Sequence, residues 1–166
     1  YDFAVVGVGP AGARFARRVA EAGYDVVAFE QGSVGTPLAC SGHVSTDVWG
    51  YVPDGAKTDL LQNRVYGARF HVGGPDDRVE LDRTLAACAE EAGADVRENH
   101  TVVDIEERHD AVALTVSNTG GIETVRAKMV AGCDGPTSRV RRQSGLPEPD
   151  ELLHGVLAFD PSPDDG

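Results

Sequence analysis

Three glycines near the start of the chain have the spacing of a dinucleotide phosphate site. The segment Gly7-Val8-Gly9-Pro10-Ala11-Gly12 has the pattern G-x-G-x-x-G. In such a site the first glycine permits a tight turn, the second lets a pyrophosphate approach bare backbone, and the third allows close helix–strand packing. The helix that follows offers free N–H groups and the positive end of its dipole to the phosphates. The pattern alone is weak, because glycine-rich turns are common.

The flanking elements supply the context that this pattern needs. Residues 2–8 form an apolar run typical of a buried parallel strand, and residues 24–29 form a second one. Between them, residues 13–22 have the pattern of a helix that ends at Gly23. This predicts a βαβ unit closed by Glu30, whose carboxylate is expected to accept hydrogen bonds from adenosine ribose hydroxyls and to disfavour the 2′-phosphate of NADP. The alternative is a plain glycine turn beside a surface glutamate.

The rest of the chain predicts one more helix, a series of strands and a final short helix. Residues 31–63 are loop-rich. The expected elements are a strand at 65–72, a helix at 81–92 ended by Gly93, a strand at 95–98, a three-stranded meander at 101–107, 111–117 and 122–127, a buried strand at 129–132, and a helix that Pro136 opens and that runs to about Ser144. The expected class is therefore α/β, a Rossmann-like fold with a parallel sheet and an inserted three-stranded antiparallel β-meander.

A second motif follows the predicted strand at 129–132. Cys133-Asp134-Gly135 leads into Pro136-Thr137-Ser138-Arg139-Val140-Arg141. Here the sequence resembles the flavoproteins of the hydroxybenzoate-hydroxylase type, whose second marker is a strand ending in Asp-Gly before Ser-x-Val-Arg. In that family the Asp lies near the ribityl and pyrophosphate parts of FAD, so the resemblance implies FAD as the cofactor. The inserted meander also favours FAD over NAD, because an NAD-binding half continues with helical crossovers. The alternative is an ordinary Asp-Gly turn at a helix entry.

A finer resemblance lies in the loop after the first βαβ unit. The segment 36–45 contains Pro37, Cys40, Gly42 and Ser45 and is similar to the Pro-x-x-Cys-x-Gly-x-x-Ser segment of the geranylgeranyl reductases, which saturate isoprenoid chains of archaeal lipids and chlorophyll precursors. The run 78–85 is similar to that family's Arg-x-x-Phe-Asp-x-x-Leu, with leucine in place of Phe. The ending at 153–160 is reminiscent of haloarchaeal members. The resemblance covers essentially the whole chain and implies flavin-dependent reduction of C=C bonds in a geranylgeranyl lipid.

The resemblance also implies which residues form the site. Cys40 is the candidate catalytic residue beside the isoalloxazine and the alkene, with a simple loop thiol as the alternative, and Asp82 is the expected N-cap of the helix at 81–92. Trp49, Tyr51 and Tyr66 either line an isoprenoid channel or, as we favour, belong to the core. The expected cofactor-binding residues are Gly7, Gly9, Pro10, Ala11, Gly12, Glu30, Gln31, Cys40, Ser41, Gly42, Arg78, Val103, Cys133, Asp134, Gly135 and Ser138.

Composition narrows the classes of partner. The net charge is −12, with 27 acidic and 15 basic residues, which disfavours nucleic acid and anionic lipid headgroups. Few lysines and many acids resemble proteins of salt-loving microbes. Three cysteines without paired spacing give no support for a metal site or a disulfide scaffold and suit a reduced cytoplasm. The expected partners are an isoprenoid lipid and an unidentified electron donor, with peripheral contact at a membrane as an option and no integral membrane segment.

Members of the resembled family are much longer than this chain. We therefore expect an N-terminal portion that is inactive alone, with residues 1–145 as the FAD-binding domain and residues 146–166 as the start of a substrate domain. Two other functions stay open. One is an FAD-dependent monooxygenase acting on a small aromatic, and the other is a truncated, non-catalytic FAD-binding chain.

Overall fold

The computed structural model describes residues 1–36, 44–61 and 80–152 of the chain. Two sheets form its framework, one parallel and one antiparallel. The elements in chain order are β1 (Phe3–Val6), α1 (Pro10–Glu21), β2 (Val26–Phe29), the 3-10 helix η1 (Thr46–Gly50), α2 (Ala56–Leu60), α3 (Glu80–Glu91), β3 (Asp95–Arg97), β4 (Thr101–Glu107), β5 (Val112–Asn118), β6 (Gly121–Ala127), β7 (Met129–Gly132) and α4 (Arg139–Gln143).

The parallel sheet has the strand order β3-β2-β1-β7, so the first strand of the chain lies between two others. Phe3 pairs with Val26 on one side and with Met129 on the other, both in parallel register. β7 returns to this sheet only after the antiparallel meander β4-β5-β6. The predicted Rossmann-like fold with an inserted three-stranded meander is confirmed.

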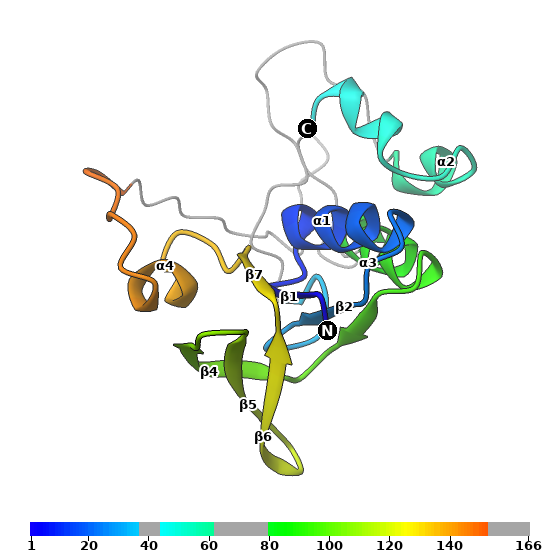
Figure 1. Ribbon diagram of the computed structural model, residues 1–166. Helices are drawn as coiled ribbons and strands as arrows, with labels where there is room; N and C mark the ends of the chain where they lie inside the picture. Colours follow the sequence, from blue (N-terminus) through cyan, green and yellow to red (C-terminus); the bar gives the residue numbers. More distant parts are fainter. Residues whose placement is uncertain (37–43, 62–79, 153–166) are drawn as a thin grey trace.

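Alternating side chains on the strands fill two separate cores. Val5, Val26 and Ala28 belong to a cluster with α1 and α3, whereas Ala4 and Phe29 belong to a cluster with the meander. Figure 1 shows α1 and α3 on one side of the parallel sheet and β4 to β6 on the other. The sheet is therefore covered on both faces, which explains why its first two strands read as continuous apolar runs.

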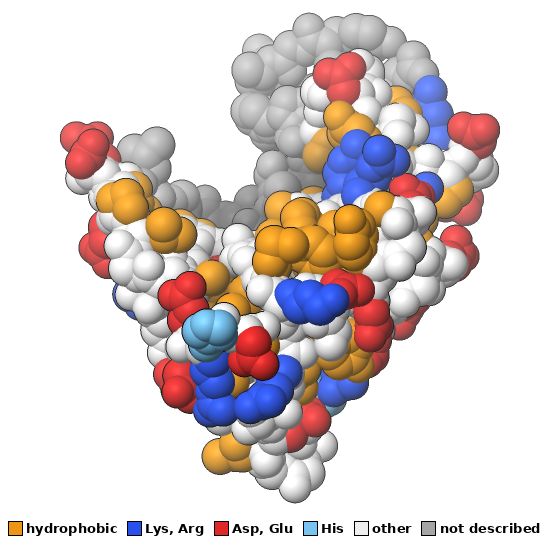
Figure 2. All heavy atoms as spheres, in the orientation of Figure 1, with side chains coloured by type: hydrophobic (Ala, Val, Ile, Leu, Met, Phe, Trp, Pro, Cys, Tyr) orange, Lys and Arg blue, Asp and Glu red, His pale blue; other side chains and the backbone are white. Residues whose placement is uncertain are grey.

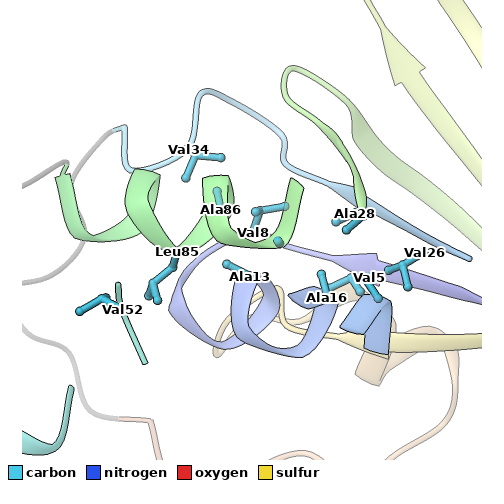
Figure 3. Packing of buried hydrophobic residues seen from close by; sticks show 13 residues of the cluster. Val5, Val8, Ala13, Ala16, Val26, Ala28, Val34, Val52, Leu85 and Ala86 are labelled. Atoms are coloured by element: carbon cyan, nitrogen blue, oxygen red, sulfur yellow. The ribbon is translucent and has the colours of Figure 1, made fainter. Parts of the chain in front are cut away.

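Helix α1 packs on the sheet through small side chains. Its buried residues are Gly12, Ala13, Ala16 and Ala20, and Figure 3 shows Ala13 and Ala16 beside Val5 of β1. The helix begins at Pro10, three residues before the predicted start, because proline suits the first helical position, where no N–H bond is required.

The predicted end of α1 at Gly23 is confirmed. Gly23 has a φ of +86°. Its N–H donates to the Ala20 carbonyl at 2.8 Å, and the Tyr24 N–H donates to the Val19 carbonyl at 3.2 Å. These are the two bonds of a Schellman cap, for which glycine is favoured.

The meander matches its predicted boundaries within a residue or two. β5 pairs with β4 and β6 in antiparallel register, and the register between β4 and β5 shifts between Val102 and Asp104, which leaves Val103 as the extra residue of a bulge. The β5–β6 turn is closed by the Gly120 N–H, which donates to the Asn118 side-chain oxygen at 2.8 Å. Turn residues and alternating strands were sufficient to predict this unit.

Two predictions about other elements were wrong. β7 was expected to be buried, but Met129 is 55% exposed, since β7 is an edge strand of the described sheet. α4 begins at Arg139 rather than at Pro136, because Ser138 is its N-cap. The loop-rich region 31–63 also contains η1 and α2. The strand expected at 65–72 lies outside the described residues.

The surface carries charges of both signs. On the face shown in Figure 2 acidic and basic side chains are interspersed. Within the described ranges, no helix is long and apolar enough to cross a membrane.

Candidate functional site

The glycine turn after β1 has a backbone reason for its first and third glycines. Gly7 has a φ of +93°, a conformation that favours glycine. A side chain on Gly12 would place its Cβ 1.9 Å from the Gly7 carbonyl oxygen, so the helix can approach the turn only without one. Among the described residues, a Cβ on Gly9 would meet nothing within 4 Å. The first and third glycines thus shape the turn, and the second borders open space.

The amino end of α1 lies at this open space. Gly9 is the N-cap of α1, and no side chain of the described residues caps it there. Pro10 and Ala11 are exposed in the first turn of the helix. A helix start with bare backbone and no carboxylate in its first turn suits a bound pyrophosphate. The arrangement therefore fits the phosphates of a dinucleotide.

Glu30 follows β2 and reaches back to the glycine turn. Its carboxylate accepts hydrogen bonds from the Val8 N–H at 2.9 Å and from the Gly32 N–H at 3.3 Å. The predicted residue is thus at the edge of the turn, where ribose hydroxyls adjoining a bound pyrophosphate would lie. The neighbouring Gln31 is exposed. Sequence reasoning placed Glu30 correctly beside the turn but did not foresee its bond to Val8.

The second motif lies directly against the first. β1 and β7 are neighbours, with Val6 paired to Gly132, so their carboxyl ends meet at one edge of the sheet. A Cβ on Gly7 would lie 2.5 Å from the Cys133 carbonyl oxygen and 3.1 Å from the Asp134 Cα. The lack of a side chain at Gly7 therefore allows the two motifs to pack backbone on backbone.

The polar side chains of the second motif bond to helix α4. The Asp134 carboxylate accepts from the Ser138 hydroxyl at 2.5 Å, the Arg139 N–H at 2.6 Å and the Val140 N–H at 3.2 Å. The Ser138 hydroxyl oxygen accepts from the Arg141 N–H at 2.9 Å. Together Asp134 and Ser138 cap the first turn of α4, which is the role that such residues have at a helix start.

The surroundings of the motif shift the pKa values of two of its residues, Asp134 and Cys133. Partial burial acts to raise the pKa of Asp134, but the hydrogen bonds from Ser138, Val140 and Arg139 outweigh it, so the pKa lies below its ordinary value. Burial and then the Asp134 charge raise the pKa of the half-buried Cys133 thiol. Asp134 is therefore an anion at neutral pH and Cys133 a neutral thiol.

A residue that sequence reasoning did not single out joins the second motif to the meander. The Arg139 guanidinium donates to the Val103 carbonyl oxygen at 2.5 Å. Val103 is the extra residue of the β4 bulge, so the bulge gives Arg139 a carbonyl to bond. Nearby, the Gln143 amide donates to Asp104 at 2.9 Å. Arg139 occupies a variable position of the Ser-x-Val-Arg pattern, and no local signal could have revealed this contact.

Two further predictions require correction. Asp82 is not the N-cap of α3, because the helix begins upstream at Glu80 and Asp82 lies within its first turn. There it is half-buried, and burial followed by the nearby Glu30 charge raises its pKa. Tyr51 is no core residue: it is 40% exposed, with the Arg14 guanidinium 3.7 Å above its ring. Trp49, by contrast, packs against the α1–α3 core.

Part of the predicted site lies outside the described residues. This part comprises the candidate catalytic residue Cys40 together with Ser41, Gly42, Arg78 and Tyr66. The described residues thus bring together the glycine turn, Glu30, the Asp134 turn and, through Arg139, Val103.

Comparisons with known proteins agree with this geometry. The family model described as an FAD binding domain matches residues 77–158. Digeranylgeranylglycerophospholipid reductase from Methanosarcina acetivorans is 33% identical, over 88% of this chain and 40% of its own length. This chain therefore spans less than half the length of that curated relative.

Solved structures show the same fold. A geranylgeranyl bacteriochlorophyll reductase-like protein from Thermoplasma acidophilum has a TM-score of 0.69 and 27% identity, over 88% of this chain and 42% of that one. The anhydrotetracycline hydroxylase OxyS from Streptomyces rimosus has a TM-score of 0.68 at 24% identity, over 87% of this chain and 34% of that one, a likeness of fold alone. The glycine turn, the adjoining Asp134 turn and these matches place the chain in the geranylgeranyl reductase family of FAD-dependent oxidoreductases.

Proposed function

We propose that this chain forms the adenosine- and pyrophosphate-binding part of an FAD-dependent enzyme that reduces C=C bonds in geranylgeranyl chains of an isoprenoid lipid. The observation that carries the proposal is the identity of 33% to a digeranylgeranylglycerophospholipid reductase over 88% of the chain. The open space at Gly9 and the uncapped start of α1 support it, because they fit the phosphates of FAD.

Each part of the described site has a separate task in this proposal. Bare backbone at Gly9 and the first turn of α1 bind the pyrophosphate, and Glu30 accepts from the ribose hydroxyls. Asp134, Gly135 and Ser138 form the wall next to the glycine turn, and Val103 borders the site from the meander. When bound in its reduced form, FAD supplies the hydride for the alkene. The task of the described residues is to bind and orient the adenosine end of the cofactor.

The remaining proposals concern residues and partners beyond this wall. Cys40, with Ser41 and Gly42, is proposed to lie beside the isoalloxazine and the alkene, and Arg78 near the phosphates. The electron donor is a further protein or small reductant that binds the complete enzyme. Residues 1–145 are proposed as the FAD-binding domain and residues 146–166 as the start of a substrate domain.

The first test is the absorption spectrum of the purified chain after incubation with FAD and removal of free cofactor. Bands of oxidised flavin that remain with the protein are the expected result. A colourless protein that also fails to quench FAD fluorescence contradicts the proposed site.

The second test is the reaction itself. Digeranylgeranylglycerophospholipid is incubated with the FAD-loaded protein and dithionite, and mass spectrometry counts the H₂ equivalents added to the lipid. A full-length relative is the positive control, and we expect little or no reduction by the chain alone, because a cofactor held only by its adenosine end leaves its reactive ring in water. Hydroxylation of a small aromatic by a longer form of this protein, without lipid reduction, would instead support the monooxygenase alternative.

A further inference from the structure

The loop that follows β2 is held along its length by the turn between β3 and β4. The Glu30 N–H donates to the Arg97 carbonyl at 2.9 Å, and the Glu30 carbonyl accepts from the His100 N–H at 2.8 Å. Two residues on, the Gly32 carbonyl accepts from the Asn99 N–H at 3.0 Å. Asn99 has a φ of +57°, a left-handed conformation that asparagine tolerates better than most residues. The end of β3 and the turn that follows it therefore form several backbone hydrogen bonds to the loop after β2.

The last bond in this series comes from a side chain. The Val34 N–H donates to the Glu98 carboxylate at 2.5 Å. Val34 is only 3% exposed, and it belongs to the same core cluster as Val8 of the glycine turn and Ala86 of α3, which Figure 3 shows near it. A bond between an N–H group and a carboxylate is shorter and stronger than one between neutral groups. Glu98 thus fixes the distal end of the loop against the core that supports the glycine turn.

We propose that Glu98 is a positioning residue for the adenosine end of FAD. It acts through the loop 30–34, which carries the Glu30 carboxylate. That carboxylate bonds to Gly32 within the loop and to Val8 of the glycine turn. Its direction therefore depends on how the loop leaves β2. This inference rests on the proposed role of Glu30 as the ribose acceptor and adds a residue to which the sequence motifs assign no role.

The position of Glu98 predicts that its removal changes ligand affinity and not only stability. Its carboxylate bonds to a residue four positions after Glu30, so removing it frees the far end of the loop while the two backbone bonds of Glu30 itself remain. The register of the parallel sheet should be kept, because the pairs between β2 and β3 end at Phe29 and Arg97, before Glu98. The effect is therefore expected in ligand affinity, at the adenosine end.

The test compares three substitutions at Glu98 with one control. Glu98→Ala removes the acceptor, Glu98→Asp keeps the charge but shortens the reach, and Glu98→Gln keeps an oxygen at the same position. Glu107→Ala removes an exposed carboxylate at the far end of β4. For each protein, FAD affinity is measured by fluorescence quenching and ADP affinity by competition, at a temperature where circular dichroism shows the folded state.

We expect Glu98→Ala to weaken FAD and ADP by the same factor, roughly tenfold, because ADP carries the part of FAD that the loop contacts. Glu98→Asp should resemble Glu98→Ala, Glu98→Gln should recover most of the affinity, and Glu107→Ala should match the parent. If Glu98→Ala does not fold, the FAD and ADP affinities of Glu98→Asp test the proposal.

Several results would overturn the proposal. These are unchanged affinity in both Glu98→Ala and Glu98→Asp, a loss for FAD without a loss for ADP, or a loss that disappears after correction for the folded fraction. A parent chain that binds neither ligand contradicts the flavin site itself, whereas intact parent binding with silent Glu98 variants contradicts only the role of Glu98. Neither conclusion requires a measurement of lipid reduction.

Discussion

The glycine turn after β1 and the Asp134 turn after β7 lie side by side, but their polar and small groups serve different purposes. In the first turn Gly9 borders open space, and the start of α1 has no side-chain cap among the described residues. In the second turn the Asp134 carboxylate already accepts three hydrogen bonds from the start of α4. The first turn leaves its backbone available to a ligand, whereas the carboxylate of the second turn is already used in hydrogen bonds to the start of α4.

This difference separates two meanings of a cofactor motif. A motif residue can contact the cofactor, or it can hold the backbone that does so. Gly9 fits the first description. Asp134 fits the second, because its carboxylate stabilises a turn whose Cys133 carbonyl would lie only 2.5 Å from a Cβ on Gly7. The experiments below test this assignment, beginning with the substitution that should affect both turns.

Gly12→Ala is expected to have the largest effect. Its Cβ would lie 1.9 Å from the Gly7 carbonyl oxygen and 3.2 Å from the Cys133 Cβ, so α1 must move away from both turns. Alanine favours a helix by about 1 kcal/mol over glycine, but a clash with backbone outweighs that gain, and overpacking costs typically about 1–3 kcal/mol or more. Chemical denaturation should show at least this loss, together with loss of FAD binding. A variant as stable as the parent would show that the turn is looser than its geometry indicates.

Gly9→Val should abolish FAD binding while leaving the fold intact. Gly9 has a φ of −68° and an extended ψ of −175°, which valine can adopt, and within the described residues its Cβ would meet no atom within 4 Å. It would instead occupy the space of the pyrophosphate. We expect at least a hundredfold loss of FAD affinity, about 2.7 kcal/mol, with a change in stability within about 1 kcal/mol. Equal flavin content in variant and parent would break the assignment of this turn as the contact surface.

Local patterns were sufficient for the first turn and for much of the fold. The glycine spacing, the two apolar runs and the glycine stops at Gly23 and Gly93 are short-range signals, and the structure places all of them as predicted. The meander was likewise predictable, because its turns and its alternation are encoded within a few residues of each other.

The second turn was only partly predictable. The strand, the Asp-Gly pair and the helix could be inferred in order, but the exposure of β7 depends on which strands flank it. The direction of the Asp134 carboxylate depends on where α4 begins, and the contact of Arg139 with Val103 joins segments 36 residues apart. Contacts between distant segments have no periodic signature in a single sequence.

Two substitutions at Asp134 test the role of the second turn, and their expected effect is smaller. Alanine removes the Asp134 part of the cap of α4, which should cost about 1–2 kcal/mol of stability, and should weaken FAD by about tenfold as the turn loosens. Asparagine caps a helix about as well as aspartate, so Asp134→Asn should recover most of both. Denaturation and fluorescence titration measure the two quantities. If Asp134→Asn keeps the stability but binds FAD as weakly as Asp134→Ala, the carboxylate itself contacts the cofactor.

The smallest expected effect is the acid dependence of the same turn. Hydrogen bonds from Ser138 and from the amino end of α4 lower the pKa of Asp134 despite its partial burial, so the ionised form is favoured in the folded protein. A carboxylate of this kind contributes stability that is present above its pKa in the unfolded chain and is lost as the pH falls through its pKa in the folded state. The window therefore lies below about pH 4, the ordinary range of an aspartate. The amide that Asp134→Asn introduces cannot titrate, so the free energy of unfolding of the parent should fall more steeply in this window than that of the variant. Parallel curves for the two proteins would show that the Asp134 carboxylate is not bonded to α4 in the folded state, and the contrast between the two turns would then be lost.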